Sequence, residues 1–209
     1  MGLGLGLVLG LGLSPVSVLG WSSVSEDPGK ILGMTLTAAA DGSALGNPGP
    51  AGWAWVIDGE QWRAGGWPRA TNNQGELMAV LDLLHATADR DEPLHVLCDS
   101  QYVINSVTQW MPGWKRRGWR KADGKPVLNR ELLEALDVAL AGRQVKFEWV
   151  KGHAGHPLNE AADDRARAAA EAFQRGSEPN RGPGIVGASP SPDVPVEGAR
   201  PQQAPPTLF

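Results

Sequence analysis

Four acidic residues stand at positions where carboxylates can do chemistry in an α/β protein. Asp41 ends an apolar run, Glu76 lies in the first turn of a predicted helix, Asp99 directly follows the run LHVLC, and Asp163 borders an alanine stripe. Strand ends and helix starts converge at one edge of an α/β sheet. Carboxylates gathered there would repel one another unless cations lay between them, and hard oxygen ligands select Mg²⁺ or Mn²⁺. Two such ions can stabilise both the attacking and the leaving oxygen of a phosphodiester displacement.

Each of these acids also has an ordinary structural interpretation. Asp41 precedes Gly42 in a common turn sequence, and an acid in a first helical turn, such as Glu76, favours the helix dipole. Asp99 before Ser100 is typical of a helix start, and Asp163 can be a solvated helix residue. Taken singly, the structural interpretation is favoured, so spacing alone does not bring the four acids together.

Two histidines, His153 and His156, are spaced i, i+3 in KGHAGHP. A zinc site is not favoured, because no third soft ligand accompanies them. His153 lies in a glycine-flanked loop, and histidine is the side chain best suited to carry a proton near neutral pH. His156 precedes a proline and is interpreted as a loop or helix-entry residue.

The elements that must position these groups form one α/β unit. Five short apolar or alternating runs predict strands, the first three antiparallel: 35–41, 51–57, 61–67, 94–98 and 144–150. Helical spacing of apolar residues predicts four helices: 72–89, one from about Ser100, 129–141 and 158–175. Asn72 or Asn73 is the expected N-cap of the first helix. The order βββαβααβα predicts a mixed sheet covered by helices.

Composition divides the 209-residue chain into three parts. Residues 1–33 are rich in Gly and Leu and carry no charge before Glu26. Without a basic start they are expected to be a disordered leader or the product of a mis-assigned start, Met34 being the true one, although a targeting segment or membrane tether stays open. Residues 176–209 hold 8 Pro and 5 Gly and predict a disordered tail. The remaining domain, 34–175, is expected to keep its stability and activity when isolated.

The net charge and the single cysteine exclude some classes of protein and favour others. The formal net charge is only −4, which marks the chain as neither strongly acidic nor strongly basic. Cys98 is the only cysteine, which excludes an internal disulfide and favours a reducing compartment, so we expect a cytoplasmic protein without a stable membrane partner. Residues 111–125 carry six basic side chains against one acid, a patch suited to phosphates, with tryptophans interleaved that can stack on sugars or bases or pack the loop.

Five blocks of sequence carry a family resemblance. They are DGSALGNPGPAG (41–52), TNNQGELMAV (71–80), CDSQYVINSVTQW (98–110), GWKRRGWRKADGKPVLN (113–129) and WVKGHAGHPLNEAADDRA (149–166). Together they closely resemble bacterial type 1 ribonuclease H over essentially all of 34–175. The resemblance implies a ribonuclease H-like fold, a five-stranded mixed sheet with helices on both faces. It also implies two-metal-ion hydrolysis of the RNA strand of RNA–DNA hybrids with Mg²⁺, Mn²⁺ being a possible substitute, to give 5′-phosphate and 3′-hydroxyl ends.

The resemblance also assigns roles to residues. Asp41, Glu76, Asp99 and Asp163 fall on the metal-binding acids, Asp41 bridging both ions, Asp163 on the attacking side and the other two on the leaving side. His153 falls on a mobile histidine that aids proton transfer or product release, while Asp164 is out of register. Amides that resemble contacts to the hybrid minor groove are Asn47, Asn72, Asn73 and Gln101. Residues expected to contact the duplex from the basic segment are Trp110, Trp114, Lys115, Arg116, Arg117, Trp119 and Arg120.

The alternative from another class is a non-catalytic module that binds hybrid or duplex RNA and has kept the fold. The intact acid set distinguishes the two and favours the nuclease. We expect a monomer whose partner is the RNA–DNA hybrid duplex.

Overall fold

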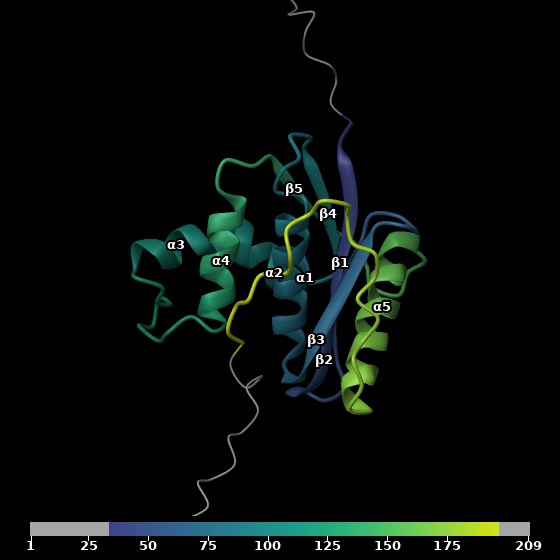
Figure 1. Ribbon diagram of the computed structural model, residues 1–209. Helices are drawn as coiled ribbons and strands as arrows, with labels where there is room; N and C mark the ends of the chain where they lie inside the picture. The colour runs from purple at the N-terminus through teal and green to yellow at the C-terminus, as the bar shows by residue number, and fades with distance from the viewer. Residues whose placement is uncertain (1–33, 197–209) are drawn as a thin grey trace, which may run out of the picture. The chain divides into compact units, whose positions relative to one another are not determined.

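The computed structural model describes residues 34–196, and the expectations for 1–33 and for 197–209 lie outside the described residues. A five-stranded sheet of order β3-β2-β1-β4-β5 forms the centre of the described part (Figure 1). Its strands are β1 (Leu36–Ala44), β2 (Gly49–Val56), β3 (Trp62–Ala70), β4 (Leu94–Cys98) and β5 (Val145–Trp149). The first three pair antiparallel, whereas β1–β4 and β4–β5 pair parallel. The sheet is therefore mixed, as predicted.

Helices cover both faces of this sheet. They are α1 (Asn72–Ala86), α2 (Gln101–Asn105), the π-helical turn η1 (Ser106–Trp110), α3 (Met111–Arg116), α4 (Arg130–Leu140) and α5 (Pro157–Gln174). α1 and α4 lie on one side, and α5 crosses the other (Figure 1). The expected fold class is confirmed, although the single helix predicted from Ser100 is a run of three short helical segments. No helix within residues 34–196 is long and apolar enough to cross a membrane.

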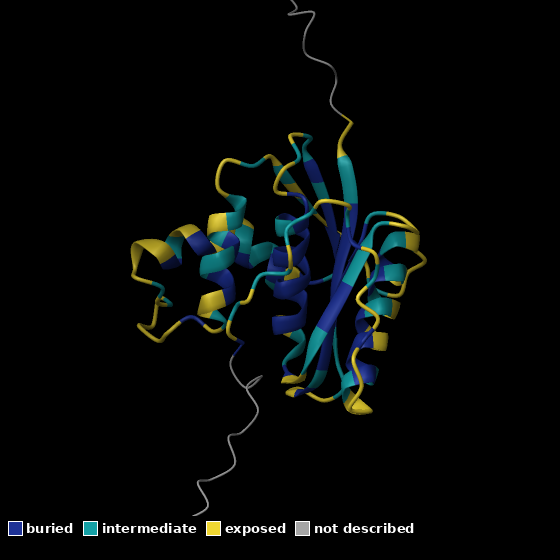
Figure 2. Cartoon of the chain, viewed as in Figure 1, coloured by how far each residue is buried: buried dark blue, intermediate teal, exposed yellow. Residues whose placement is uncertain are grey.

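α1 is the most deeply buried helix, dark along almost its whole length in Figure 2. Such all-round burial follows from its place between the sheet and α4. The N-cap of this helix is Thr71, the residue before Asn72, and the side chains of Thr71 and Gln74 form a reciprocal capping box. The prediction of Asn72 or Asn73 as N-cap was wrong, because the Thr-x-x-Gln pattern satisfies the free N–H groups and releases both asparagines.

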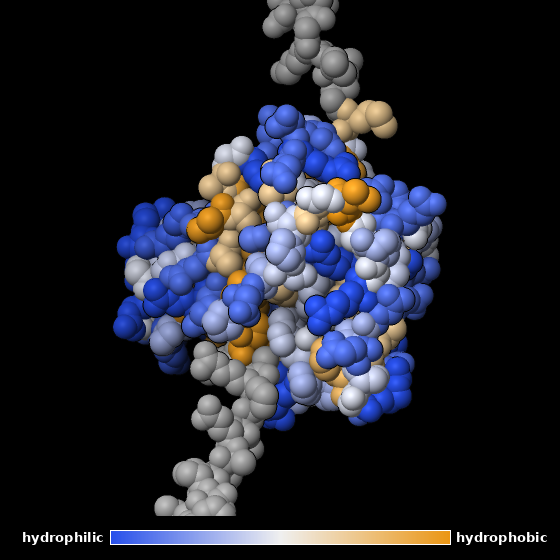
Figure 3. All heavy atoms as spheres, in the orientation of Figure 1, coloured by the Kyte–Doolittle hydropathy of each residue, from blue (hydrophilic) through white to orange (hydrophobic). Residues whose placement is uncertain are grey.

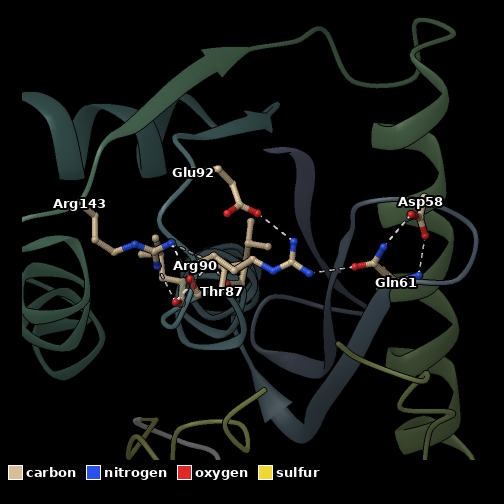
Figure 4. Close-up of polar contacts among 8 residues, drawn as sticks. Asp58, Gln61, Thr87, Arg90, Glu92 and Arg143 are labelled. Carbon is tan, nitrogen blue, oxygen red and sulfur yellow. Dashed lines mark hydrogen bonds and ion pairs between the residues drawn. The ribbon is translucent and has the colours of Figure 1, made fainter. Parts of the chain in front are cut away.

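The opposite end of α1 is held by an arginine from the loop before β5. Arg143 donates to the carbonyl oxygens of Leu84 (2.7 Å) and Thr87 (3.0 Å), which the helix leaves without intrahelical partners (Figure 4). A cation at a helix C-terminus also complements the helix dipole. Nearby, Arg90 donates to the side chain of Gln61 (3.4 Å) and so links this end to the β2–β3 turn.

Residues 177–196, here called the C-terminal strap, differ from the disordered tail that their composition predicts. The Ala64 N–H donates to the Arg181 carbonyl (3.0 Å), and the Gly184 N–H donates to the Trp62 carbonyl (2.9 Å), so the strap pairs with the open edge of β3. Beyond this edge the strap passes to the α1 side of the sheet (Figure 1), where Val196 is buried in the main core. The strap needs no core of its own, because a few apolar residues suffice to cover a face that is already folded.

A buried ionic cluster fastens the strap to the body. Asp82 of α1 is fully buried and accepts from the indole N–H of Trp55 (2.6 Å). Arg63 of β3 lies 3.4 Å from the same carboxylate and also donates to the Ser189 carbonyl (3.2 Å). A buried carboxylate is tolerated only when it is paired and hydrogen-bonded, so the strap carbonyl helps to hold the arginine that Asp82 requires.

We therefore predict that a chain ending at residue 175 unfolds at a lower temperature than the parent. Its β3 edge and one face of α1 would be uncovered, and each kcal/mol lost corresponds to about 2–4 °C in a domain of this size. Thermal denaturation followed by circular dichroism measures the change. A chain ending at Val196 is the matched control, because it keeps the strap and loses only residues 197–209. Equal melting temperatures for the parent and the chain ending at 175 would contradict the packing role of the strap.

Candidate active site

Three carboxylates meet where β1, α1 and β4 come together. Asp41 lies in β1, Glu76 in the first turns of α1, and Asp99 directly after β4. One carboxylate oxygen from each lies within 4.8 Å of the other two. β1 and β4 are parallel neighbours with Ala39 opposite Leu97, so two further residues along each strand bring Asp41 beside Asp99. The structure thus gathers three of the four acids that the sequence singled out.

Glycines bring the third element, α1, close enough to complete this cluster. A Cβ atom added to Gly42 would lie 2.2 Å from the backbone nitrogen of Glu76, and one added to Gly75 would lie 3.2 Å from the Gly42 Cα. Only two bare backbones can approach so closely. The start of α1 therefore rests directly on the strand residue that follows Asp41. Both glycines stand in the quoted motifs, but their contact could not be seen in the sequence.

The cluster is electrostatically unfavourable in the absence of cations. Burial raises the pKa of Asp41 to about 8, and the neighbouring Asp99 carboxylate adds to the increase. Burial is also the main cause of the raised pKa values of Glu76 and Asp99. Three carboxylates with raised pKa values at one site, and oxygen ligands alone, fit a hard divalent cation.

Side-chain hydrogen bonds orient two of the three acids, Glu76 and Asp99, and Asp41 accepts from the Gly42 backbone N–H (2.7 Å). The Ser100 hydroxyl donates to one Glu76 oxygen (2.5 Å), and the Asn72 amide donates to the other (2.8 Å). Asn159, buried at the start of α5, hydrogen-bonds Asp99 and lowers its pKa against the effect of burial. Sequence reasoning identified Ser100 only as a helix start, which it is, and did not identify Asn159, because both contacts join distant segments.

Asp163 lies on α5 at the margin of the cluster, outside the set of oxygens that meet within 4.8 Å. Its charge still raises the pKa values of Asp41 and Asp99, so it faces the same site. His153 Nδ1 lies 3.6 Å from the Asp163 carboxylate, and the histidine side chain is 73% exposed. His153 has a positive φ of 51°, which places it at the tip of a tight turn. Asp163 and His153 thus form the open side of the site.

The three asparagines predicted to bind substrate lie beside the acid cluster, and their side chains make different contacts. Asn47 and Asn73 are exposed and line a pocket of about 380 Å³ together with Arg69, Thr71 and Asn129. Asn72 differs, because its side chain is committed to Glu76 and its N–H donates to the Asn47 side chain (3.2 Å).

Gln101 is exposed at the start of α2, two residues after Asp99. The pocket residues Arg69, Thr71 and Asn129 were not identified from the sequence. The Thr-x-x-Gln capping pattern could have identified Thr71.

The basic segment projects from the body on α3 and the turns that follow, over a mainly hydrophilic surface (Figures 1 and 3). Its exposed cations are Lys115, Arg116, Arg117, Arg120 and Lys125. Lys115 is paired with Asp137 of α4 (2.7 Å), whereas Arg116 has no ion pair among the described residues.

The three tryptophans of the segment are not equivalent. Trp114 is only 9% exposed and belongs to the main core, which favours the second of the two alternatives, that it packs the loop onto the body. Trp110 is 40% exposed and lies over Trp114, with ring centroids 5.7 Å apart. Trp119 is partly buried with a φ of 61°. Trp114 therefore anchors the segment to the core, and Trp110 is the ring that the segment exposes most.

Comparison with known proteins identifies related chains. The sequence model of the RNase H family matches residues 34–171. Ribonuclease H of Tropheryma whipplei (strain Twist) is 54% identical over 149 residues, which are 71% of this chain and 92% of the relative. Ribonuclease H of Escherichia coli O139:H28 is 50% identical over 133 residues, 62% of this chain and 85% of the relative. The crystal structure of LC9-RNase H1, a type 1 RNase H with the type 2 active-site motif, aligns with a TM-score of 0.56 at 26% identity. The alignment covers 80% of this chain and 98% of that chain.

The raised pKa of Asp41 predicts how the metal-free protein responds to pH. The folded-state pKa of about 8 lies above the unfolded value near 3.8, so the folded protein holds this proton more tightly. Stability should therefore fall as the pH rises from about 4 to about 8. Asp41→Asn should flatten this dependence and melt above the parent at pH 8, measured by thermal denaturation in EDTA. Asp164→Asn, at an exposed neighbour of Asp163, is the control and should follow the parent. A parent and an Asp41→Asn variant with parallel pH profiles would contradict the prediction.

Proposed function

The chain belongs to the RNase H family of metal-dependent endoribonucleases, and on this basis we propose that it hydrolyses the RNA strand of RNA–DNA hybrids. The observation that carries the proposal is the cluster of Asp41, Glu76 and Asp99, whose oxygens lie within 4.8 Å. A protein that only bound nucleic acid would gain nothing from gathering three carboxylates at one site, since carboxylates repel phosphates. The geometry therefore favours the nuclease over the binding module.

Two Mg²⁺ ions are the proposed cofactors, and Mn²⁺ shares their preference for oxygen ligands. When bound, such ions stabilise the attacking and leaving oxygens of a phosphodiester displacement. Asp41, the most buried of the four site acids, would contact both, with Glu76 and Asp99 on the leaving side and Asp163 on the attacking side. We further propose 5′-phosphate and 3′-hydroxyl product ends, as the resemblance implies. His153, exposed beside Asp163, is proposed to carry a proton at this open side.

Two surfaces of the described chain suit the two strands of a hybrid. The amides of Asn47, Asn73 and Gln101 are exposed beside the acids, and amides can hydrogen-bond both 2′-hydroxyl groups and base edges. Arg69 and Thr71 offer a cation and a hydroxyl in the pocket beside Asn73, a combination that suits a backbone phosphate. The basic segment on α3 supplies further phosphate contacts at a distance from the acids. We propose that the protein acts as a monomer in the cytoplasm, where its single thiol, the buried Cys98, stays reduced.

Asp41→Asn tests the proposed reaction directly. The substitution keeps the side-chain volume but removes the charge that two cations would share, so cleavage should be lost while hybrid binding stays measurable. A labelled RNA–DNA hybrid, with RNA–RNA and DNA–DNA duplexes as controls, is incubated with and without Mg²⁺. Asp164→Asn makes the same chemical change at an exposed acid and should cleave at the parental rate. Cleavage by Asp41→Asn at the parental rate would contradict the two-metal assignment, and a parent that binds hybrids without cutting them would favour the binding module.

The double variant Arg116→Ala/Arg117→Ala tests the basic segment. It should raise KM far more than it lowers kcat, because phosphate contacts away from the acids contribute equally to ground-state and transition-state binding. The plot of log affinity against log salt should flatten by about 0.7–0.9 for each phosphate that the variant no longer neutralises. Preference for hybrid over DNA duplex should persist, since phosphate contacts do not identify the strands.

Arg175→Ala/Arg181→Ala is the control of equal charge. Both of these arginines are exposed and pair with glutamates at the end of α5 or in the strap, so the salt slope should not change. An unchanged slope in Arg116→Ala/Arg117→Ala would show that the segment is only a solvated loop. A fall in kcat at constant KM would show instead that the segment shapes the active site.

A further inference from the structure

Asp99 is the least buried of the three clustered acids. It follows β4 in a bend and has one side-chain partner, Asn159, whereas Glu76 has a side-chain donor on each of its two oxygens. The charge of Asp163 acts on it as a repulsive neighbour. A carboxylate in this position would rotate away from Asp41 and Glu76 unless its surroundings opposed the rotation.

The backbone of Asp99 is held by a tryptophan at the end of the adjacent strand. The indole N–H of Trp149 donates to the Asp99 carbonyl (3.0 Å). Trp149 is the last residue of β5 and pairs in register with Cys98, directly before Asp99. Nearly half of its surface, 49%, is exposed. Its ring therefore contributes little to the core, and its distinctive contact is the hydrogen bond to Asp99.

A glycine three residues later borders the carboxylate itself. A Cβ atom added to Gly152 would lie 2.4 Å from Asp99 Oδ2, well inside van der Waals contact. Gly152 is not among the residues with positive φ, so its backbone conformation does not require glycine. Gly155, in the same turn, is the opposite case: its φ is 82°, and nothing lies within 4 Å of an added Cβ. Glycine is thus required at 152 because a side chain there would collide with the Asp99 carboxylate. It is required at 155 because the turn has a positive φ there.

We propose that Trp149 and Gly152 are positioning residues for Asp99. Trp149 fixes the backbone from which the carboxylate projects, and Gly152 leaves the space in which Oδ2 sits while the carboxylate faces Asp41 and Glu76. The inference rests on the proposed function in one respect, that these three acids hold a divalent cation. An alanine at 152 would meet the mobile end of a side chain, so the carboxylate would turn and the fold would persist.

The test compares Gly152→Ala with Gly155→Ala in the full chain. Mn²⁺ affinity is measured by isothermal titration calorimetry without nucleic acid, and hybrid affinity is measured in EDTA. Gly152→Ala should weaken Mn²⁺ binding by about 10–100-fold, the usual effect of disturbing the support of a metal ligand, and leave metal-free hybrid binding unchanged. Gly155→Ala should lower the melting temperature through backbone strain and leave Mn²⁺ affinity unchanged. Parental Mn²⁺ affinity in Gly152→Ala would overturn the proposal.

Trp149→Phe provides a second, independent variant. It keeps an aromatic ring at a half-exposed site and removes only the N–H donor, so it should fold and bind Mn²⁺ more weakly than the parent. The Mg²⁺ concentration that gives half-maximal cleavage should rise in both variants, with KM for the hybrid at saturating Mg²⁺ unchanged. If Gly152→Ala failed to fold, an unaltered Mn²⁺ affinity in Trp149→Phe would overturn the proposal. A parent that binds Mn²⁺ but leaves hybrids intact would overturn the proposed function alone, and the variants' metal affinities would still decide how Asp99 is positioned.

Discussion

Repulsion among buried carboxylates is the constraint on which the structure depends. Asp41, Glu76 and Asp99 bring their oxygens within 4.8 Å of one another in a region where burial raises the pKa of Asp41 to about 8. Such an arrangement forms only if the elements that carry the acids are held together by contacts elsewhere. The close backbone contact between Gly42 and Gly75 joins β1 to α1, and the parallel β1–β4 pairing fixes the third member. The fold itself therefore holds the three carboxylates together.

The two sides of the site differ in how firmly they are held. Glu76 has a donor on each oxygen, from Ser100 and Asn72, and lies on the most buried helix. On the other side, Asp163 of α5 lies beside His153. His153 is exposed and belongs to a turn whose residues are mostly exposed. A fixed inner side suits the binding of cations in a constant geometry. An exposed outer side leaves His153 room to move, as the proton transfer proposed for it requires.

Much of this architecture could be predicted from the sequence, and the errors have physical causes. Strand β4 was predicted to the residue, and the other strands within about three residues, because alternating and apolar runs report local structure directly. The residue types and motifs of the acids were enough to predict a metal-binding role for them. Their supports could not be predicted, since the contacts of Gly152 and Asn159 with Asp99 join segments about 50 to 60 residues apart. For the tryptophans of the basic segment, stacking and packing both stayed open, because an interleaved pattern of aromatic and basic residues does not reveal that Trp114 is the ring that faces inward.

The C-terminal strap shows why composition alone misjudged a segment rich in Pro and Gly. Composition indicates whether a segment has enough apolar residues to form a hydrophobic core of its own. The strap instead packs a few apolar residues against the core that the rest of the domain forms. An edge strand with open hydrogen-bonding groups and a helix with a buried Asp82 both need a cover, and the strap supplies two backbone hydrogen bonds and a carbonyl for Arg63. The strap follows α5, which carries Asp163, and ends against the core that contains α1, which carries Glu76. It therefore joins the two faces of the sheet across its edge, and the stability it adds helps to offset the electrostatic cost of the acid cluster.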